Sequence, residues 1–384
     1  MILLKKICIN FFLQGLKQFA FLFINNTLPF FFKLFYRLKK KKIISLKKSP
    51  YIKKILVVRS NYLGDMVVFI PVLDNLRKSF PNAHITLITS KIGAEVIKNE
   101  KLVNEIIYCS IYDINNKKTL YEKIKLSIFI RKKKYDLAIC STQENNLWFS
   151  FFTFFSKAKI RIGFEKNDGA FFFNIQIKLK KDLSEINQNL RIIKFLSLKI
   201  INKTPSFTMI KNKQIKFLDL FNNNFIYIGI SPFGKRNSRS WVLKRYTLLC
   251  EILDHNPKFK IIFFGTDKHE SKIQNMIAKL NKNKIINLAG KTSINDLKFL
   301  LNKLDVLITI DSGPMHLAAA LGINTIALIG PSDWQKWGYN IKNFKVIRNP
   351  NYNCIPCYLD ECKEHSCMKS IEVDNVIKKV YEFI

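Results

Sequence analysis

Apolar and polar positions follow two rhythms along most of the chain. Short apolar runs such as Ile55–Val58 are typical of buried parallel strands. Between them lie longer segments such as Met66–Phe80, in which apolar residues recur every three or four positions and predict helices. This alternation predicts a parallel sheet covered by helices. The strands predicted in this first series are Ile55–Val58, Ile85–Thr89, Leu137–Cys140 and Ile160–Gly163.

A second series of the same kind begins near Phe225, after the polar segment Lys211–Asn224. We therefore predict two Rossmann-like domains, residues 51–220 and 221–384, with the ligand in the cleft at the carboxyl ends of the strands. The last stretch, Val373–Ile384, is predicted to pack as a closing helix through Val376, Ile377, Val380 and Tyr381. The strands predicted in this series are Ile226–Ile230, Ile261–Phe264, Ile285–Leu288, Val306–Ile310 and Thr325–Ile329.

The first 50 residues differ from the rest. Ile7–Tyr36 is rich in Phe, Leu and Ile, and a basic run, Lys39–Lys42, follows it. Polar interruptions argue against a transmembrane helix, and the lack of a small-residue cleavage site argues against a signal peptide. We predict an arm, residues 1–50, that lies on an anionic bilayer surface. The alternative is a helix packed on the protein's own core.

The net charge of the chain gives only limited evidence about its partners. The 384 residues contain 64 Lys and Arg against 28 Asp and Glu, a formal net charge of +36. Such an excess suggests an anionic partner, but a solvated surface in a chain rich in Lys throughout would need none. The basic residues are dispersed and form no recognition module, so we expect no nucleic-acid partner. A hydrophobic share of 48% argues against disorder.

The turn Arg59–Asp65 follows the first predicted strand and precedes the first predicted helix. Gly64 is expected to let the backbone turn tightly and approach a ligand. Asp65 then lies near the helix N-terminus, where the helix dipole stabilises a carboxylate. It is a candidate general base, and the alternative is an ordinary helix cap. A position at the carboxyl end of a strand favours catalysis.

A second turn, Asp311–His316, also connects a strand to a helix. Ser312 and Gly313 leave backbone N–H groups at a positive helix terminus, which suits a phosphate. His316, about one turn further on, can add a donor to the same anion, and Asp311 can accept hydrogen bonds from sugar hydroxyls. The alternative is a capped helix with a surface histidine.

Basic residues gather in the loop after Ile230, where Lys235, Arg236 and Arg239 lie close together. Arg can bind a diphosphate through two parallel hydrogen bonds, and the alternative is a solvated loop. The acidic groups of the later segment Gly265–Glu270 suit either a ribose or a helix cap. Spacing alone does not decide between these two roles.

Four cysteines lie within fourteen residues of one another near the C-terminus. Four thiols match the ligand count of a structural zinc site, although their spacing is compressed. Paired disulfides or a thiol-rich turn are the alternatives. The other cysteines are scattered, mostly in apolar runs, which favours a reducing compartment. The candidate ligands are Cys354, Cys357, Cys362 and Cys367.

Three segments together resemble glycosyltransferase family 9, the heptosyltransferases: Ile55–Pro71, Asp305–Gly338 and the cysteine-bearing Cys354–Ile371. The resemblance covers roughly residues 53–384 and leaves the arm outside. It implies an α/β fold of the GT-B type, with two Rossmann-like domains whose parallel sheets face a central cleft. It also implies transfer of a heptose from ADP-L-glycero-D-manno-heptose to the lipopolysaccharide inner core, on the cytoplasmic face of the bacterial inner membrane.

The same resemblance implies roles for individual residues. Asp65 matches the family's general base, on the acceptor-side turn with Arg59 and Gly64. Arg239 stands where the family usually has Lys, Glu270 matches a ribose-binding Glu, and Thr292 falls near the adenine edge. No cofactor is expected to be required for transfer. A nucleotide-binding protein without transferase activity, or a member using another sugar donor, is the alternative. The implied donor site comprises Lys235, Arg239, Glu270, Thr292, Asp311, Ser312, Gly313 and His316.

Overall fold

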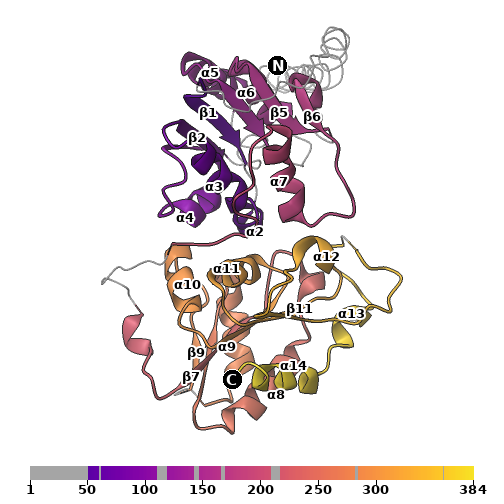
Figure 1. The fold of residues 1–384 in the computed structure, drawn as a ribbon. Coiled ribbons are helices and arrows are strands. Elements are labelled where there is room, and N and C mark those ends of the chain that lie inside the picture. Colours follow the sequence, from indigo (N-terminus) through magenta and orange to yellow (C-terminus); the bar gives the residue numbers. More distant parts are fainter. Residues whose placement is uncertain are drawn as a thin grey trace, which may run out of the picture.

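Two six-stranded sheets form the framework of the chain (Figure 1). The computed structural model describes residues 51–59, 62–109, 119–141, 147–165, 169–208, 217–281, 284–357 and 359–384. The predicted arm, residues 1–50, lies outside the described residues, as do residues 211–216 of the predicted join Lys211–Asn224. None of the described helices is long and apolar enough to cross a bilayer.

The first sheet has the strand order β3-β2-β1-β4-β5-β6, and all its pairs are parallel. Helices α2, α3, α4 and α7 share a core with one face, and α5 and α6 with the other. Its strands are β1 (Lys54–Val58), β2 (His84–Thr89), β3 (Glu105–Tyr108), β4 (Leu137–Cys140), β5 (Ile160–Phe164) and β6 (Ile175–Ile177). Its helices are α2 (Leu63–Val67), α3 (Ile70–Ser79), α4 (Lys91–Ile97), α5 (Leu120–Lys132), α6 (Leu147–Phe155), η2 (Ala170–Phe172) and α7 (Glu185–Phe195).

The second sheet has the order β12-β11-β10-β7-β8-β9, again parallel. Its strands are β7 (Ile226–Ser231), β8 (Phe259–Phe263), β9 (Ile285–Asn287), β10 (Val306–Ile310), β11 (Thr325–Leu328) and β12 (Phe344–Ile347). The helices of this half are η3 (Leu218–Leu220), η4 (Asn237–Arg239), α8 (Leu243–Asp254), η5 (Asp267–His269), α9 (Glu270–Ile277), α10 (Ile294–Leu301), α11 (Gly313–Leu321), α12 (Trp334–Trp337), α13 (Ser366–Lys369) and α14 (Val373–Tyr381).

Both sheets have the same connectivity, in which the strand order reverses once. The reversal lies between β1 and β4 in the first sheet and between β7 and β10 in the second. A crevice opens at the carboxyl ends of the strands at such a point, because the two flanking connections run to opposite faces. The turns after β1, β7 and β10 carry the chemistry-bearing residues that the sequence singled out.

The two halves meet across their carboxyl edges. Figure 1 shows α2, α4 and α7 at the lower edge of the indigo-to-magenta half, opposite α10, α11 and α12 of the orange half. One continuous apolar core spans both halves. At the contact of α4 with α10, the buried Lys298 ammonium lies 3.4 Å from the Glu100 carboxylate and donates to the Val96 carbonyl. Sequence reasoning did not foresee this pair.

The predicted strands are confirmed to within two residues, but three strands were missed. β3, β6 and β12 are only three or four residues long and partly exposed, so they lack a continuous apolar run. The single helix predicted over 66–80 is wrong: it is broken between α2 and α3. Pro71 explains the break, because proline is tolerated in the first turn of a helix but not in its interior.

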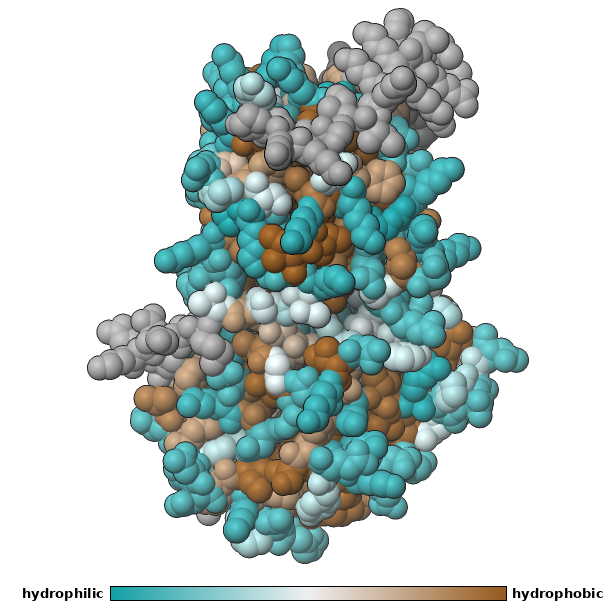
Figure 2. Space-filling view, viewed as in Figure 1, coloured by the Kyte–Doolittle hydropathy of each residue, from teal (hydrophilic) through white to brown (hydrophobic). Residues whose placement is uncertain are grey.

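The predicted closing helix is confirmed as α14, which packs on α8. Val376 and Val380 are buried there, but Tyr381 is exposed, so the predicted apolar face was wrong at that residue. The predicted domain boundary at 220 falls between β6 and β7 and stays a prediction. Hydrophilic side chains cover much of both halves of the face in Figure 2, with smaller apolar groups between them.

Candidate active site

Asp65 lies in the first turn of α2, directly after the turn that follows β1. Its Oδ2 accepts a hydrogen bond from the Tyr62 backbone N–H at 3.3 Å, so the capping role left open by the sequence is present. The other carboxylate oxygen lies 3.4 Å from the Arg59 guanidinium. The side chain remains 19% exposed. A carboxylate that is oriented by these contacts and still reaches solvent can act as a general base.

Arg59 is buried and contacts several groups around Asp65. Its Nη1 donates to the Ser141 carbonyl at 2.7 Å, which ties β1 to β4 at the reversal point of the first sheet. Its Nη2 donates to the Asp65 backbone carbonyl at 3.2 Å and lies 3.7 Å from Glu185 Oε1. The guanidinium also lies over the Phe69 ring. Arg59 therefore positions Asp65 through several contacts at once.

Glu185 was missed by sequence reasoning. It lies in the first turn of α7, is buried, and reaches Arg59 on its own half. Its second carboxylate oxygen lies 3.8 Å from the Lys336 ammonium of α12, so the pair crosses the cleft. Burial raises the pKa of Glu185, against the opposing effect of Arg59 and Lys336. A first-turn Glu is common in helices, so no local signal distinguished it.

Two glycines let α2 and α11 approach each other closely. A Cβ added at Gly64 would lie 2.6 Å from the His316 ring, and one at Gly313 would lie 2.9 Å from Leu63. The tight turn expected at Gly64 was wrong, because this residue lies within α2, and the expected approach to a ligand stays a prediction. Its role is close packing across the cleft, which brings the first turns of the two helices together.

His316 is buried in α11 between both halves. Burial lowers its pKa, although the charges of Asp311 and Asp65 oppose this, so the ring is neutral at pH 7. Nδ1 lies 2.9 Å from the Tyr339 hydroxyl, whose own pKa is raised by burial. Either group can donate in this pair, and the other ring nitrogen, Nε2, lies 3.9 Å from the Asp311 carboxylate. The predicted surface histidine is thus excluded.

Arg239, in η4, is joined to the turn after β10. Its Nη1 donates to the Asp311 backbone carbonyl at 3.1 Å and lies 3.2 Å from the carboxylate. The Asp311 carboxylate is buried in this contact, and its predicted bond to a sugar hydroxyl stays a prediction. Lys235 reaches across the cleft to Tyr62, with its ammonium 4.1 Å from the ring centroid. Arg239 therefore contacts the turn that leads into α11, and Lys235 contacts the N-cap residue of α2.

The N-terminus of α11 completes this cationic corner. Ser312 is its N-cap residue and, within the described chain, makes no side-chain capping hydrogen bond. The backbone N–H groups that follow, beginning at Gly313, are therefore not occupied by that side chain. Because these groups carry the positive end of the helix dipole, they can bind an anion together with Arg239.

The other two predicted donor-side residues lie further along the same edge. Glu270 opens α9 and its carboxylate lies 3.2 Å from the Lys291 ammonium. Thr292 follows Lys291 directly. The loops after β8 and β9 are joined by a hydrogen bond from Gly290 N to the Gly265 carbonyl. Glu270 and Thr292 thus follow the neighbouring strands β8 and β9. They lie beside the point between β7 and β10 where the strand order reverses, and not at that point.

The cysteine-bearing tail supports η4. Ser238 donates from its backbone N to Asp360 O at 2.9 Å and from its hydroxyl to Leu359 O at 2.7 Å. His365 Nε2 lies 2.8 Å from the Ser238 carbonyl. These contacts fix the backbone beside Arg239, so the tail positions a residue of the candidate site.

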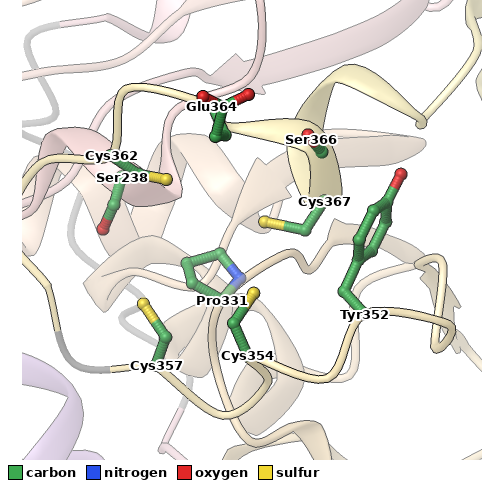
Figure 3. A pocket seen from close by; sticks show the side chains of 9 residues that line it. All are labelled: Ser238, Pro331, Tyr352, Cys354, Cys357, Cys362, Glu364, Ser366 and Cys367. Atoms are coloured by element: carbon green, nitrogen blue, oxygen red, sulfur yellow. The ribbon is translucent and has the colours of Figure 1, made fainter.

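The four thiols of this tail surround one cavity (Figure 3). All four are free, and Cys367 is buried, which raises the pKa of its thiol. Among the described residues, no three or more Cys, His, Asp or Glu side chains are arranged to hold a metal ion. The predicted zinc site at Cys354, Cys357, Cys362 and Cys367 therefore stays a prediction, with a disulfide or packing role as its alternative.

Metal analysis distinguishes these roles. If the thiols bind zinc, anaerobically purified protein is expected to contain about one equivalent per chain, and Cys357→Ser to lower both the metal content and Tm. Ser366→Ala, which changes another residue lining the same cavity, is the matched control and should keep the metal. Metal-free protein with a normal Tm would leave only disulfide formation or packing.

Comparison with known proteins agrees with this arrangement. A family model described as glycosyltransferase family 9 (heptosyltransferase) matches residues 124–368. Lipooligosaccharide heptosyltransferase 2 of Campylobacter jejuni is 28% identical over 346 residues, which cover 85% of this chain and 97% of the relative.

Two solved structures share the fold. The ADP-heptose lps heptosyltransferase II of E. coli has a TM-score of 0.70 at 20% identity and covers 86% of this chain and 98% of its own. E. coli heptosyltransferase WaaC with ADP-2-deoxy-2-fluoro heptose has a TM-score of 0.66 at 16% identity and covers 86% of this chain and 99% of its own. The two parallel sheets facing a central cleft are thus the GT-B arrangement.

Proposed function

Because this chain belongs to glycosyltransferase family 9, the heptosyltransferases, we propose that it transfers a heptose from ADP-L-glycero-D-manno-heptose to the inner core of lipopolysaccharide, with inversion at the anomeric carbon. One observation carries this proposal. The first turn of α2, with the Asp65 carboxylate, packs against the first turn of α11, with the neutral His316 and Arg239 beside it. A base and a cationic corner therefore share one cleft.

The base acts on the acceptor. An inverting displacement needs a carboxylate that removes the proton of the attacking hydroxyl as the new bond forms. Asp65 is oriented by Tyr62 and Arg59 and is partly exposed to the cleft. Its carboxylate takes up the proton, and the sugar inverts because the hydroxyl attacks opposite to the departing phosphate.

The cationic corner acts on the donor. Negative charge develops on the diphosphate as the bond to the sugar breaks, and fixed donors stabilise it without reorganising. Arg239 and Lys235 supply positive charge, and the first amides of α11 supply the helix dipole. His316 adds a ring nitrogen, Nε2, that can donate a hydrogen bond to the diphosphate. Glu270 and Thr292, on neighbouring loops, are placed to hold the ribose and the adenine edge.

A donor and acceptor screen tests the proposal. Full-length protein is incubated with ADP-heptose or other nucleotide sugars and with purified, progressively truncated lipopolysaccharides. We expect ADP release and a mass increase of one heptose only with ADP-heptose and one truncation. Turnover with another nucleotide sugar alone would overturn the donor assignment, and transfer to an acceptor outside lipopolysaccharide would overturn the acceptor assignment.

We also propose that the protein works at the cytoplasmic face of the inner membrane, where the arm, residues 1–50, contacts anionic lipid. The arm combines the Phe-rich stretch Ile7–Tyr36 with the basic run Lys39–Lys42. Deleting it is expected to weaken co-sedimentation with anionic vesicles and to leave ADP binding intact, because the candidate donor site lies in residues 235–316. Vesicle binding unchanged by the deletion would contradict this role.

A further inference from the structure

The outer face of α5 is unusually apolar. Among the described residues, fifteen large apolar side chains are exposed, and five of them lie on this one helix of 13 residues. Single exposed apolar residues are normal, but a group on one element marks an interaction surface. The five are Leu120, Tyr121, Ile124, Ile128 and Phe129.

Three of the exposed side chains form a row on one face of α5, separate from the face that the helix buries. Leu120, Ile124 and Ile128 are four residues apart, so they are neighbours on one face. The adjoining buried face, which includes Ile130 and Ser127, packs against the first sheet and α6. A helix on the surface of a globular protein is expected to be polar on its outer face. The outer face of α5 is therefore left without an apolar partner within the described residues.

Basic side chains surround this row. Lys125, Arg131 and Lys132 are exposed on α5, and Lys134 follows it. The helix has a single acidic residue, Glu122, whose carboxylate is engaged by the Thr119 backbone at 2.7 Å. The outer surface of α5 therefore has a positive net charge.

This combination identifies the partner. Apolar side chains flanked by Lys and Arg suit an anionic bilayer, where acyl chains take the apolar groups and headgroups the charges. The core of a protein interface is depleted in Lys, and a nucleic acid offers no site for an aliphatic row. We propose that the outer face of α5 docks on an anionic phospholipid bilayer. This inference rests on the membrane location under the proposed function and assigns it a second contact surface, on α5, which needs neither donor nor acceptor nor the arm.

Vesicle binding by the full chain tests the proposal. Vesicles of phosphatidylglycerol and phosphatidylcholine, free of lipopolysaccharide, are compared with vesicles of phosphatidylcholine alone. The double variant Ile124→Ser/Ile128→Ser is expected to bind the anionic vesicles about tenfold more weakly. The matched control is Leu248→Ser on α8, because Leu248 and Ile124 are both 45% exposed. The control should bind like the parent.

The charges are tested separately. Each of Lys125→Glu and Lys132→Glu should weaken binding to anionic vesicles by about fivefold or more and leave the weak binding to neutral vesicles unchanged. Lys244→Glu on α8 is the control, because Lys244 is also exposed and lies on the other half. All variants should keep the parental Tm and ADP affinity. Equal binding by the α5 variants and their controls would overturn the proposal.

A second measurement distinguishes the bilayer from other occupants of this face. Ile128→Trp places a fluorophore in the row, and brominated phosphatidylglycerol should quench its added fluorescence, whereas Leu248→Trp should not be quenched. Unquenched fluorescence in vesicle-bound protein would show that residues 1–50 or another segment covers α5 and would overturn the proposal. A dimer that Ile124→Ser/Ile128→Ser dissociates, seen by light scattering, would assign the face to a second copy.

Discussion

Asp65→Asn is expected to reduce kcat by roughly 10²–10⁴-fold, the usual contribution of a positioned general base. Asn has the same shape and can still accept the hydrogen bond from the Tyr62 backbone, so α2 keeps its cap. What it loses is the ability to take the proton of the acceptor hydroxyl. ADP affinity, measured by calorimetry, should hardly change, because the cationic corner lies on the other half. Turnover is measured by ADP release.

The matched variants lie on the donor side. His316→Ala and Arg239→Ala each remove a contact to the diphosphate, so ADP should bind more weakly, by about 1.5–3 kcal/mol for the charged residue. Arg239→Lys keeps the charge and should lose less. The division of labour is wrong if Asp65→Asn keeps near-normal turnover, or if it loses ADP binding while His316→Ala does not.

Arg59→Met is expected to lower the free energy of unfolding by about 3–5 kcal/mol. Arg59 is buried, and its removal leaves the buried Glu185 and the nearby Asp65 without their shared cation. The Ser141 carbonyl after β4 also loses its hydrogen bond from the Arg59 guanidinium. Urea denaturation measures the change. Lys379→Met, which breaks an exposed pair with Glu382 on α14, is the control and should have a far smaller effect.

A double variant separates charge from packing. In the double variant Arg59→Met/Glu185→Gln no buried carboxylate remains at position 185. The decrease in the free energy of unfolding should therefore be smaller than the sum of the decreases in the two single variants. A loss equal to that sum would show that Arg59 and Glu185 do not interact energetically. The Lys336 contact then predicts a second effect: Glu185→Gln alone should also weaken the coupling of the two halves, seen as a higher KM for the acceptor.

The sequence determined the two sheets and the location of the site. Strands buried on both faces must be continuous apolar runs, and nine of the twelve can be predicted from that pattern alone, whereas the short β3, β6 and β12 are partly exposed and carry no such signal. Parallel strands bring their carboxyl ends to one edge of their sheet, so the turn with Asp65 had to lie at that edge of the first sheet and the turns with Arg239 and His316 at that edge of the second.

Tertiary structure decided how these residues act. Gly64 serves the packing of α2 on α11, which no local pattern specifies because His316 lies about 250 residues further along the chain. The lowered pKa of His316 comes from its burial beside Tyr339. The ion pair of the buried Arg59 with Glu185 joins β1 to α7, far apart along the chain. Local sequence fixes periodicity and turns, because these depend on neighbouring residues. Burial and charge pairing depend on residues that only the folded chain brings together.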